Sequence, residues 1–273
     1  MTNRGNFIWR LLIILVFLFP GMSALQPDII QQLRQEILLR QGFRPPTAAA
    51  VDMGLGPVEA AFPHGVFPTG AMHEVIVAGA EGMAAGSGFL AALIGPLMRR
   101  GGAVIWVGGE RRVFPPGLAA FGVDAEKVIF LSVRKEARAL WAMEEALKCE
   151  GLAAVVGEVR EIAGIPSRRL QLAVEQSRVT GFLLRESPRN GNPIAAVARW
   201  RVSAEAGGRP DENGLEVPGV GFARWKVELS RIRNGRPGNW VMEWRAGRFH
   251  PVLPEEAAAP ERAGVIEARR QTG

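Results

Sequence analysis

MHEVIVAGAEGMAAGSGFLAALIGPLMRR, residues 72–100, is the stretch of sequence that decides the fold. Its apolar β-branched run at 75–77 predicts a buried strand. A glycine-rich turn is expected to follow at 79–88, and apolar residues then recur at helical spacing from 89 to 97. A strand, a glycine-rich turn and a helix form the opening unit of a nucleotide-binding α/β domain, in which backbone N–H groups and a helix N-terminus face a phosphate.

This turn lacks the residues of a working phosphate-binding loop. A Walker A loop ends in Gly-Lys-[Ser/Thr], where the lysine reaches the β- and γ-phosphates and the hydroxyl binds magnesium. No lysine occurs between residues 79 and 88. The stretch is therefore either a structural turn without a ligand or a weak nucleotide or anion site made by backbone N–H groups. The candidate nucleotide-binding residues of this degenerate loop are Gly79, Glu81, Gly82, Gly86, Ser87 and Gly88.

Length and composition limit the classes of function. A chain of 273 residues can bury one good core. Its formal net charge is +6, and most of the basic residues are arginines, which bind phosphate oxygens in pairs. This charge favours a nucleic acid or another acidic partner. Cys149 is the only cysteine and the three histidines have no zinc-like spacing with it, so we expect no disulfide and no metal site.

The N-terminus allows two interpretations. Residues 1–24 have the pattern of a secretory signal, with basic residues beside the apolar run 11–19 and small residues at the end. That run is too short to span a bilayer as a helix, which needs about 20 residues. Alternatively, translation begins at Met22, and residues 1–21 are a mis-annotated upstream extension.

The segments that flank the core are expected to differ in character. Within residues 22–42, Asp28 can cap an amphipathic helix, which either packs on the core or docks a partner. Residues 43–70 are rich in Pro, Gly and Ala and are expected to be a linker wrapped on the core domain, 71–250. The tail, 251–273, lacks periodicity and is expected to be disordered.

Strands and helices alternate after residue 100. The expected strands are 103–107, 128–133, 152–156 and 182–184. The expected helices are 115–121 and 136–149, followed by one that Ser167 caps and Gly181 ends. Short turns between alternating strands and helices predict a mostly parallel sheet with helices on both faces.

The C-terminal part of the core changes to antiparallel strands. Residues 196–202 and 224–232 alternate between apolar and charged positions, and a loop is expected between them at 204–220. A turn at 234–238 leads to a further alternating run, which makes a basic hairpin. We expect this hairpin either to contact the DNA backbone or to form a solvated face. Its candidate DNA-binding residues are Arg224, Lys226, Arg231, Arg233, Arg236 and Arg245, with Arg248 after them and Glu228 and Glu243 opposing them.

Several segments together resemble the RecA-like ATPase core and, within it, the ImuA family, also described as SulA/RecA-like. The resemblance covers roughly residues 25–250. It is carried by LRQEILLRQGF (33–43), GAMHEV (70–75), FPPGLAAFGV (114–123), ALWAMEEAL (139–147), AAVVGE (153–158), SRRLQL (167–172) and RWKVELSRIRNGRPGNWVMEW (224–244).

The resemblance implies a three-layer RecA-like fold with residues 79–88 in the Walker A place. Glu110 takes the position of a glutamate that polarises the attacking water, and Glu158 follows the strand that normally ends in the Walker B aspartate. Arg231 and Arg233 lie where RecA proteins carry lysines that reach a neighbouring nucleotide. Because the Walker A lysine is missing, Glu110 and Glu158 are vestigial candidates, and we expect no catalytic residue.

The function implied by the resemblance is that of a cytoplasmic, non-catalytic accessory protein of SOS-induced, error-prone translesion DNA synthesis. The implied partners are an ImuB-like Y-family protein, a DnaE-type error-prone polymerase, RecA, and DNA without base specificity. No cofactor is expected beyond weakly bound ATP, and no membrane. A family start near 33–43 favours Met22 over the signal peptide. Two rivals stay open: a RecA-like DNA-dependent ATPase with an altered nucleotide loop, and a secreted α/β protein.

Overall fold

The computed structural model describes residues 51–109, 113–188, 194–210, 216–218 and 221–252. The chain divides into two units, residues 1–48 and 49–273, and all the described residues belong to the second. The predictions for the N-terminal 24 residues, the 22–42 helix, Glu110 and the tail beyond residue 252 therefore lie outside the described residues.

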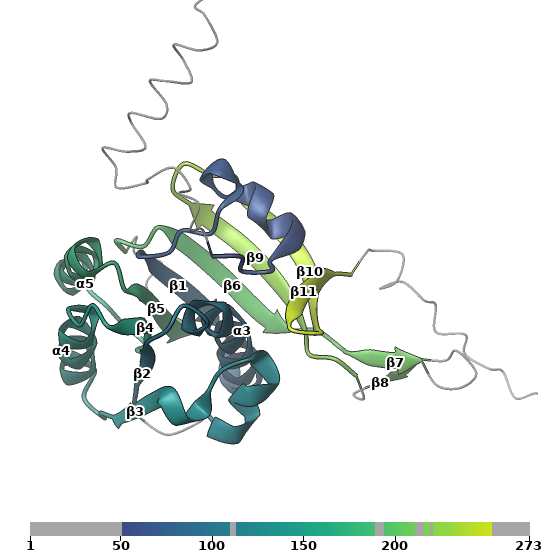
Figure 1. Ribbon diagram of the computed structural model, residues 1–273, viewed down its shortest axis with the longest axis horizontal. Helices are drawn as coiled ribbons and strands as arrows, with labels where there is room; N and C mark the ends of the chain where they lie inside the picture. The colour runs from purple at the N-terminus through teal and green to yellow at the C-terminus, as the bar shows by residue number, and fades with distance from the viewer. Residues whose placement is uncertain (1–50, 110–112, 189–193, 211–215, 219–220, 253–273) are drawn as a thin grey trace, which may run out of the picture. The chain divides into compact units, whose positions relative to one another are not determined.

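A nine-stranded mixed sheet forms the centre of the domain (Figure 1). Its strand order is β11-β10-β9-β6-β1-β5-β4-β2-β3. The parallel block consists of β1 (Met72–Val77), β2 (Ala103–Gly108), β3 (Val128–Ser132), β4 (Leu152–Glu158), β5 (Thr180–Glu186) and β6 (Ala198–Ala204). The antiparallel extension consists of β9 (Arg224–Ile232), β10 (Gly238–Arg245) and β11 (Arg248–Pro251). The predicted α/β class, with antiparallel strands at the C-terminal end, is confirmed.

Helices cover both faces of the sheet, as predicted. The helix α3 (Gly79–Met98) lies on one face, beside the side chains of Val77 and Leu184. On the other face, α4 (Glu136–Leu147) and α5 (Gly164–Ser177) bury an aliphatic cluster over β1, β2, β4 and β5. Short 3₁₀ helices complete the domain: η1 (Gly56–Ala61), η2 (Pro63–Gly65), η3 (Pro115–Phe121) and η4 (Ala125–Lys127).

α3 is the central helix of the domain. Within the described part of the chain, it is the one helix long and apolar enough to cross a membrane. However, 72% of its apolar window is buried inside the domain. Residues Leu90 and Leu93 have no exposed surface. Its apolar character is therefore explained by burial against the sheet.

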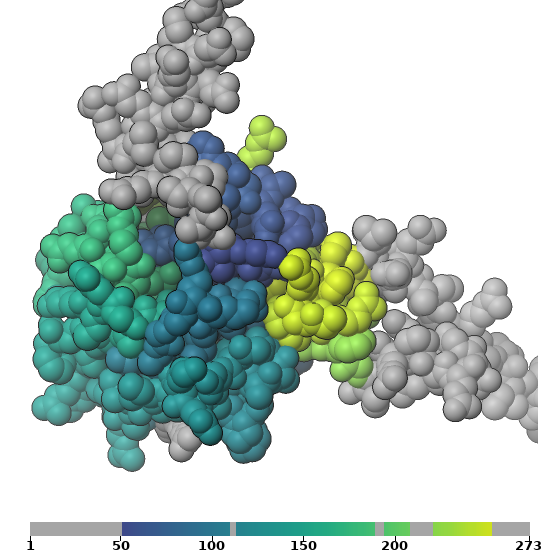
Figure 2. Space-filling model, in the orientation of Figure 1, coloured from purple at the N-terminus to yellow at the C-terminus, as the bar shows by residue number. Residues whose placement is uncertain are grey.

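Residues 51–70 pack onto the face of the sheet that carries α3. The Phe62 ring lies 5.8 Å from the Trp200 ring of β6, and Phe67 stacks on His73 of β1 at 4.5 Å. Met53 and Leu55 are each 1% exposed. In Figure 2 this segment, in purple and blue, lies against the yellow C-terminal strands. These residues are the described part of the expected linker, and they add buried side chains to the core. We call residues 51–70 the strap.

The stretch 79–88 is helical, so the predicted glycine-rich turn is wrong. β1 ends at Val77, and α3 begins at Gly79 with Ala78 as its N-cap. A Cβ on Gly86 would lie 2.7 Å from Val77 Cγ1 and 2.9 Å from Leu184 Cδ1. Glycine at this position therefore lets the helix approach the sheet closely, which is a packing requirement rather than a turn requirement.

Other predicted boundaries also differ from the structure. Ser167 lies inside α5, whose N-cap is Ala163, and the buried Ser167 hydroxyl accepts a hydrogen bond from the Ala195 N–H at 2.6 Å. α5 ends at Ser177, with Arg178 as a C-cap in the left-handed conformation, whereas Gly181 is part of β5. The expected loop 204–220 contains a short antiparallel ribbon of β7 (Gly208–Pro210) and β8 (Glu216–Pro218).

Candidate functional site

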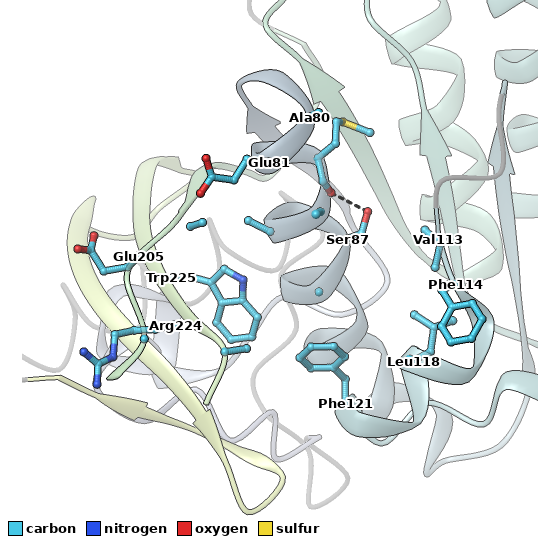
Figure 3. Close-up of a pocket in the computed structure, with 18 of the residues that line it drawn as sticks. Ala80, Glu81, Ser87, Val113, Phe114, Leu118, Phe121, Glu205, Arg224 and Trp225 are labelled. Carbon is cyan, nitrogen blue, oxygen red and sulfur yellow. Dashed lines mark hydrogen bonds between the residues drawn. The ribbon is translucent and has the colours of Figure 1, made fainter. Parts of the chain in front are cut away.

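A large groove lies beside the first half of α3, near the carboxyl ends of β5 and β6. Ligands of open α/β sheets bind at the carboxyl ends of the strands, so this is the expected place for a site. The groove has a volume of about 1050 Å³ and runs between α3, η3 and the segments around β6 and β9 (Figure 3). It is lined by the large apolar side chains Met83, Val113, Phe114, Leu118, Phe121, Phe222 and Trp225, and by the charged residues Glu81, Arg160, Glu186, Glu205 and Arg224.

The six candidate nucleotide-binding residues do not form one surface. Glu81, Ser87 and Gly88 line the groove, whereas Gly82 and Gly86 face Val77 on the sheet side of α3. The sixth candidate, Gly79, is the first residue of the helix. The Ser87 hydroxyl is used within the helix, since it donates to the Met83 carbonyl oxygen at 2.8 Å (Figure 3).

The N-terminal end of α3, which is the positive end of its dipole, carries a negatively charged side chain of its own. Glu81 lies in the first turn of the helix, where a negative side chain is stabilised by the helix dipole. The two arginines of the groove have carboxylate partners: Arg160 lies 3.4 Å from Glu186, and Arg224 lies 2.9 Å from Glu243. The charge arrangement therefore offers little attraction to a phosphate group.

Glu158 is held by a neighbouring strand at the carboxyl end of β4. Trp106 Nε1 donates to Glu158 Oε1 at 2.7 Å. Nearby, the Arg160 N–H donates to Glu136 Oε1 at 2.7 Å, beside a smaller cavity of about 220 Å³. No group of three His, Cys, Asp or Glu side chains that could hold a metal ion is found within the described ranges.

The predicted basic hairpin separates its cations into two groups. Arg224 and Arg245 lie at one end of the β9–β10 pair, while Arg231, Arg233 and Arg236 lie at the other end. Arg231 lies seven residues after Arg224 along the strand, which corresponds to about 23 Å. The hairpin therefore does not bring all the candidates together.

The individual hairpin cations differ in their surroundings. The Arg224 side chain is 11% exposed, and besides its ion pair it donates to the Ala206 carbonyl oxygen at 3.3 Å. Arg245 lies over the Phe222 ring at 5.9 Å, and Arg248 pairs with Asp52 at 2.7 Å. These three arginines thus have intramolecular partners.

A bulge brings Arg231 to the outer face of the sheet, which already carries two cations. The register between β6 and β9 shifts, so that Arg199 is opposite Arg231 while Trp200 is opposite Leu229. As a result, exposed Arg231 lies on the same outer face as exposed Arg201 and Lys226. We call Arg201, Lys226 and Arg231 the outer basic face.

A buried ion-pair network lies under this face, and sequence reasoning missed it. Glu74 of β1 has no exposed surface, and its carboxylate accepts from Arg185 Nη1 and from Arg199 Nε, each at 2.5 Å. Buried charges are stable only when they are paired in this way. The strand alternation on β6 indicated that Arg199 faces away from Trp200, but no sequence pattern indicated its partner.

Two exposed aromatic residues of the groove were also missed. Phe114 is 72% exposed and is the N-cap residue of η3, and Phe222 is 47% exposed and lies just before β9. A signal was available, since large aromatic side chains are unusual in exposed turns unless they meet a partner.

Comparison with known proteins identifies full-length relatives. The chain is 36% identical over 250 residues to Protein ImuA of Caulobacter vibrioides, from strain NA1000 / CB15N and from strain ATCC 19089 / CIP 103742 / CB 15. Each match covers 86% of this chain and 100% of the relative. A weaker similarity, 28% over 122 residues, is found to the Cell division inhibitor SulA of Edwardsiella piscicida, over 43% of this chain and 71% of that protein.

No protein-family model matches the chain. The two ImuA relatives are sufficient to assign the family, because the similarity extends along their whole length. The chain belongs to the ImuA family.

Proposed function

We propose that this chain is a non-catalytic, cytoplasmic accessory protein of damage-induced mutagenesis, and that it acts within an error-prone translesion DNA synthesis complex. Its membership of the ImuA family supports the pathway. The observation that carries the non-catalytic role is the direct passage from β1 to α3, with only Ala78 between Val77 and Gly79. This connection is too short to wrap around a phosphate group.

The charges beside α3 support the same conclusion. Phosphoryl transfer depends on cations that stabilise the charge of the transition state. At the place where such cations would act, the first turn of α3 carries Glu81. The groove arginines Arg160 and Arg224 are engaged with Glu186 and Glu243.

An ATPase assay tests the non-catalytic role. The purified full chain should release phosphate from ATP at the background rate, with or without single-stranded DNA. A rate above background that is lost in Glu110→Gln and Glu158→Gln would contradict the proposal and favour a RecA-like ATPase with an altered loop. Glu126→Gln, which makes the same substitution at an exposed position outside both cavities, is the matched control.

The proposed protein partners are an ImuB-like Y-family protein and a DnaE-type polymerase, with RecA as a further partner. In the host, deletion of the gene should lower the frequency of ultraviolet-induced mutations, and the Glu158→Gln variant should restore it fully. Co-purification of the tagged chain with these partners after DNA damage tests the complex. A deletion strain with an unchanged induced mutation frequency would contradict the proposed pathway.

The proposed DNA contact is through the outer basic face. Cations that neutralise phosphates release counterions, so affinity should fall steeply as salt concentration rises. Replacing Lys226 and Arg231 together with alanine should lower the log–log salt slope by about 2. Arg245→Ala with Arg248→Ala removes the same charge from two arginines that have intramolecular partners and should change the slope less. Fluorescence anisotropy with a labelled oligonucleotide measures both, and an unchanged slope in the first variant would contradict this contact.

A further inference from the structure

We infer that the groove beside α3 is a docking site for a partner-protein segment in which a large apolar side chain is flanked by lysine or arginine. The inference rests on the proposed function only in expecting a protein partner. It is carried by the shape, the apolar floor and the charges of the groove (Figure 3).

The floor of the groove is aromatic and aliphatic. Trp225 and Leu118 are 2% and 4% exposed and form the base, and Phe121 lies between them (Figure 3). At the rim, Phe114 and Phe222 expose most or half of their rings. Large apolar side chains that remain accessible around a buried apolar base are typical of the centre of a protein interface.

The size of the groove favours a peptide segment over a small molecule. Its volume of about 1050 Å³ is at the upper limit of ligand pockets, which span about 300–1,000 Å³. The lining residues come from six separate stretches of the chain, between Ala80 and Trp225. An opening of this extent can accept several consecutive side chains.

The rim of the groove carries negative charge. Glu81 from α3 and Glu205 after β6 are both exposed, and Figure 3 shows them on the side of the groove that also carries Arg224. Within the described residues, neither of these two glutamates forms an ion pair. Arg160 and Arg224, in contrast, have carboxylate partners of their own. A basic residue next to the apolar anchor therefore complements the rim.

The base of the groove is held rigidly. The Trp225 ring lies 6.0 Å from Phe121 and 6.1 Å from Phe89, a buried residue of α3. Gly88 allows the Trp225 ring to lie close to the backbone of α3, because a Cβ at this position would lie 3.4 Å from Trp225 Cζ2. A preformed base reduces the entropy cost of ordering side chains on binding.

The experiment is a selection of peptides on the folded, full-length chain. A phage library of random dodecapeptides is panned against the wild-type chain and depleted on Phe114→Asp with Phe222→Asp. We expect the enriched peptides to share a large apolar residue with lysine or arginine within two positions. Enrichment of acidic peptides, of peptides without an apolar residue, or of none at all would overturn the inference.

Binding of an enriched peptide is then measured by fluorescence anisotropy. Glu81→Lys with Glu205→Lys should weaken it by about tenfold or more. Glu126→Lys with Glu150→Lys makes the same change of charge at exposed positions outside the groove and should leave the affinity within about twofold. Equal losses in both variants would show a non-specific charge effect and overturn the site.

Two controls separate the possible failures. Thermal unfolding of Phe114→Asp with Phe222→Asp shows whether the variant is folded, and a melting temperature near that of the wild type is expected because both rings are exposed. Should that variant unfold, Phe114→Ala alone, which removes the most exposed ring, should still weaken the peptide by about tenfold. The peptide assay needs neither DNA damage nor the host. Failure of the groove proposal can therefore be distinguished from failure of the proposed function, which the mutagenesis assay tests.

Discussion

The two faces of the sheet are packed by different kinds of side chain. The face under α4 and α5 is aliphatic, and its buried cluster includes Met143, Leu147, Leu170 and Val155. The face that carries α3 is aromatic, and its rings form a connected series in which neighbouring centroids lie 4.5–6.1 Å apart. This series joins Phe62, Phe67, Phe89, Phe121, Phe182, Trp200, Trp225, Trp244, Phe249 and the His73 ring.

The difference shows two ways of covering one sheet. Aliphatic side chains of α4 and α5 pack on strands that lie next to them in sequence, as in any βαβ unit. The aromatic face instead collects the strap, α3, η3, β6 and the C-terminal strands, which are far apart in sequence. Large rings can contact several distant segments at once, so this face connects the antiparallel extension to the parallel block.

The largest expected effect concerns the centre of the aromatic face. Trp200 has no exposed surface, and its ring contacts Phe62 and Phe89. Trp200→Ala should lower the free energy of unfolding by about 3–5 kcal/mol, measured by urea unfolding with circular dichroism. Trp141→Ala removes the same ring from the outside of α4, where it is 60% exposed, and should change stability by less than about 0.5 kcal/mol. Similar losses in both would contradict the assigned role of the aromatic face.

A second test compares how closely helices approach each face. Gly86→Ala forces a Cβ against the β-branched Val77 and should cost about 1–3 kcal/mol. On the other face, a Cβ on Gly157 would meet Sδ of Met143, whose flexible side chain can move, so Gly157→Ala should cost less. Chemical denaturation of the two variants decides this, and a reversed order would show that α3 has room to shift.

The pH dependence of stability sharpens the comparison, because only the aromatic face contains a buried histidine. His73 Nε2 donates to the Pro68 carbonyl oxygen at 2.8 Å, and Nδ1 accepts from Trp200 Nε1 at 3.4 Å. Burial lowers the pKa of His73 to about 4, from an ordinary value of 6.5. The unfolded chain therefore binds a proton that the folded chain does not, and stability is lost as pH falls below 6.5.

This loss should be about 1 kcal/mol between pH 6.5 and 5.5. Urea unfolding at the two pH values measures it, with His73→Gln as the variant that lacks the titrating group. The variant should be less stable at pH 7 but show a smaller change over this range. An equal change in both proteins would assign the pH dependence to other groups.

The smallest expected effect concerns the charged contact of the strap. The Gly54 N–H lowers the pKa of Asp52, and Arg248, 2.7 Å away, lowers it further. Because both side chains of this pair are 62% exposed, Asp52→Asn should change the free energy of unfolding by less than about 0.5 kcal/mol. Phe62→Ala, which removes a buried ring of the same segment, is the comparison and should cost several times more. If Asp52→Asn lowered the free energy of unfolding more than Phe62→Ala, the ion pair rather than the buried ring would be what attaches the strap to the domain.

The fold was largely predictable because its parallel strands are short apolar runs between turn residues. The bounds of β9 and η3 were predicted to the residue. α3 was misjudged at its start, because glycine favours turns in general but here allows close packing against Val77. Ser167 was misjudged because a hydroxyl that resembles a cap instead binds the Ala195 N–H, which is distant in sequence.

The candidate site was less predictable than the fold. Sequence alternation placed Trp225 correctly in the interior, and it is 2% exposed. It could not show that Phe114 and Phe222 border the same groove, because their proximity depends on tertiary contacts between η3 and the antiparallel extension. The DNA-binding residues proposed from the hairpin stay a prediction, since the structure divides them between two ends of a strand.

The position of β1 has a consequence for how the protein emerges from the ribosome. Among the described strands and α-helices, β1 and α3 are synthesised first, yet β1 pairs only with β5 and β6, and α3 is covered by strands as late as β11. At about 5–20 residues per second, the ribosome needs on the order of ten seconds to add these strands. During that interval the nascent chain displays a helix as apolar as a membrane span, so its yield in cells should depend on chaperones that shield emerging polypeptides.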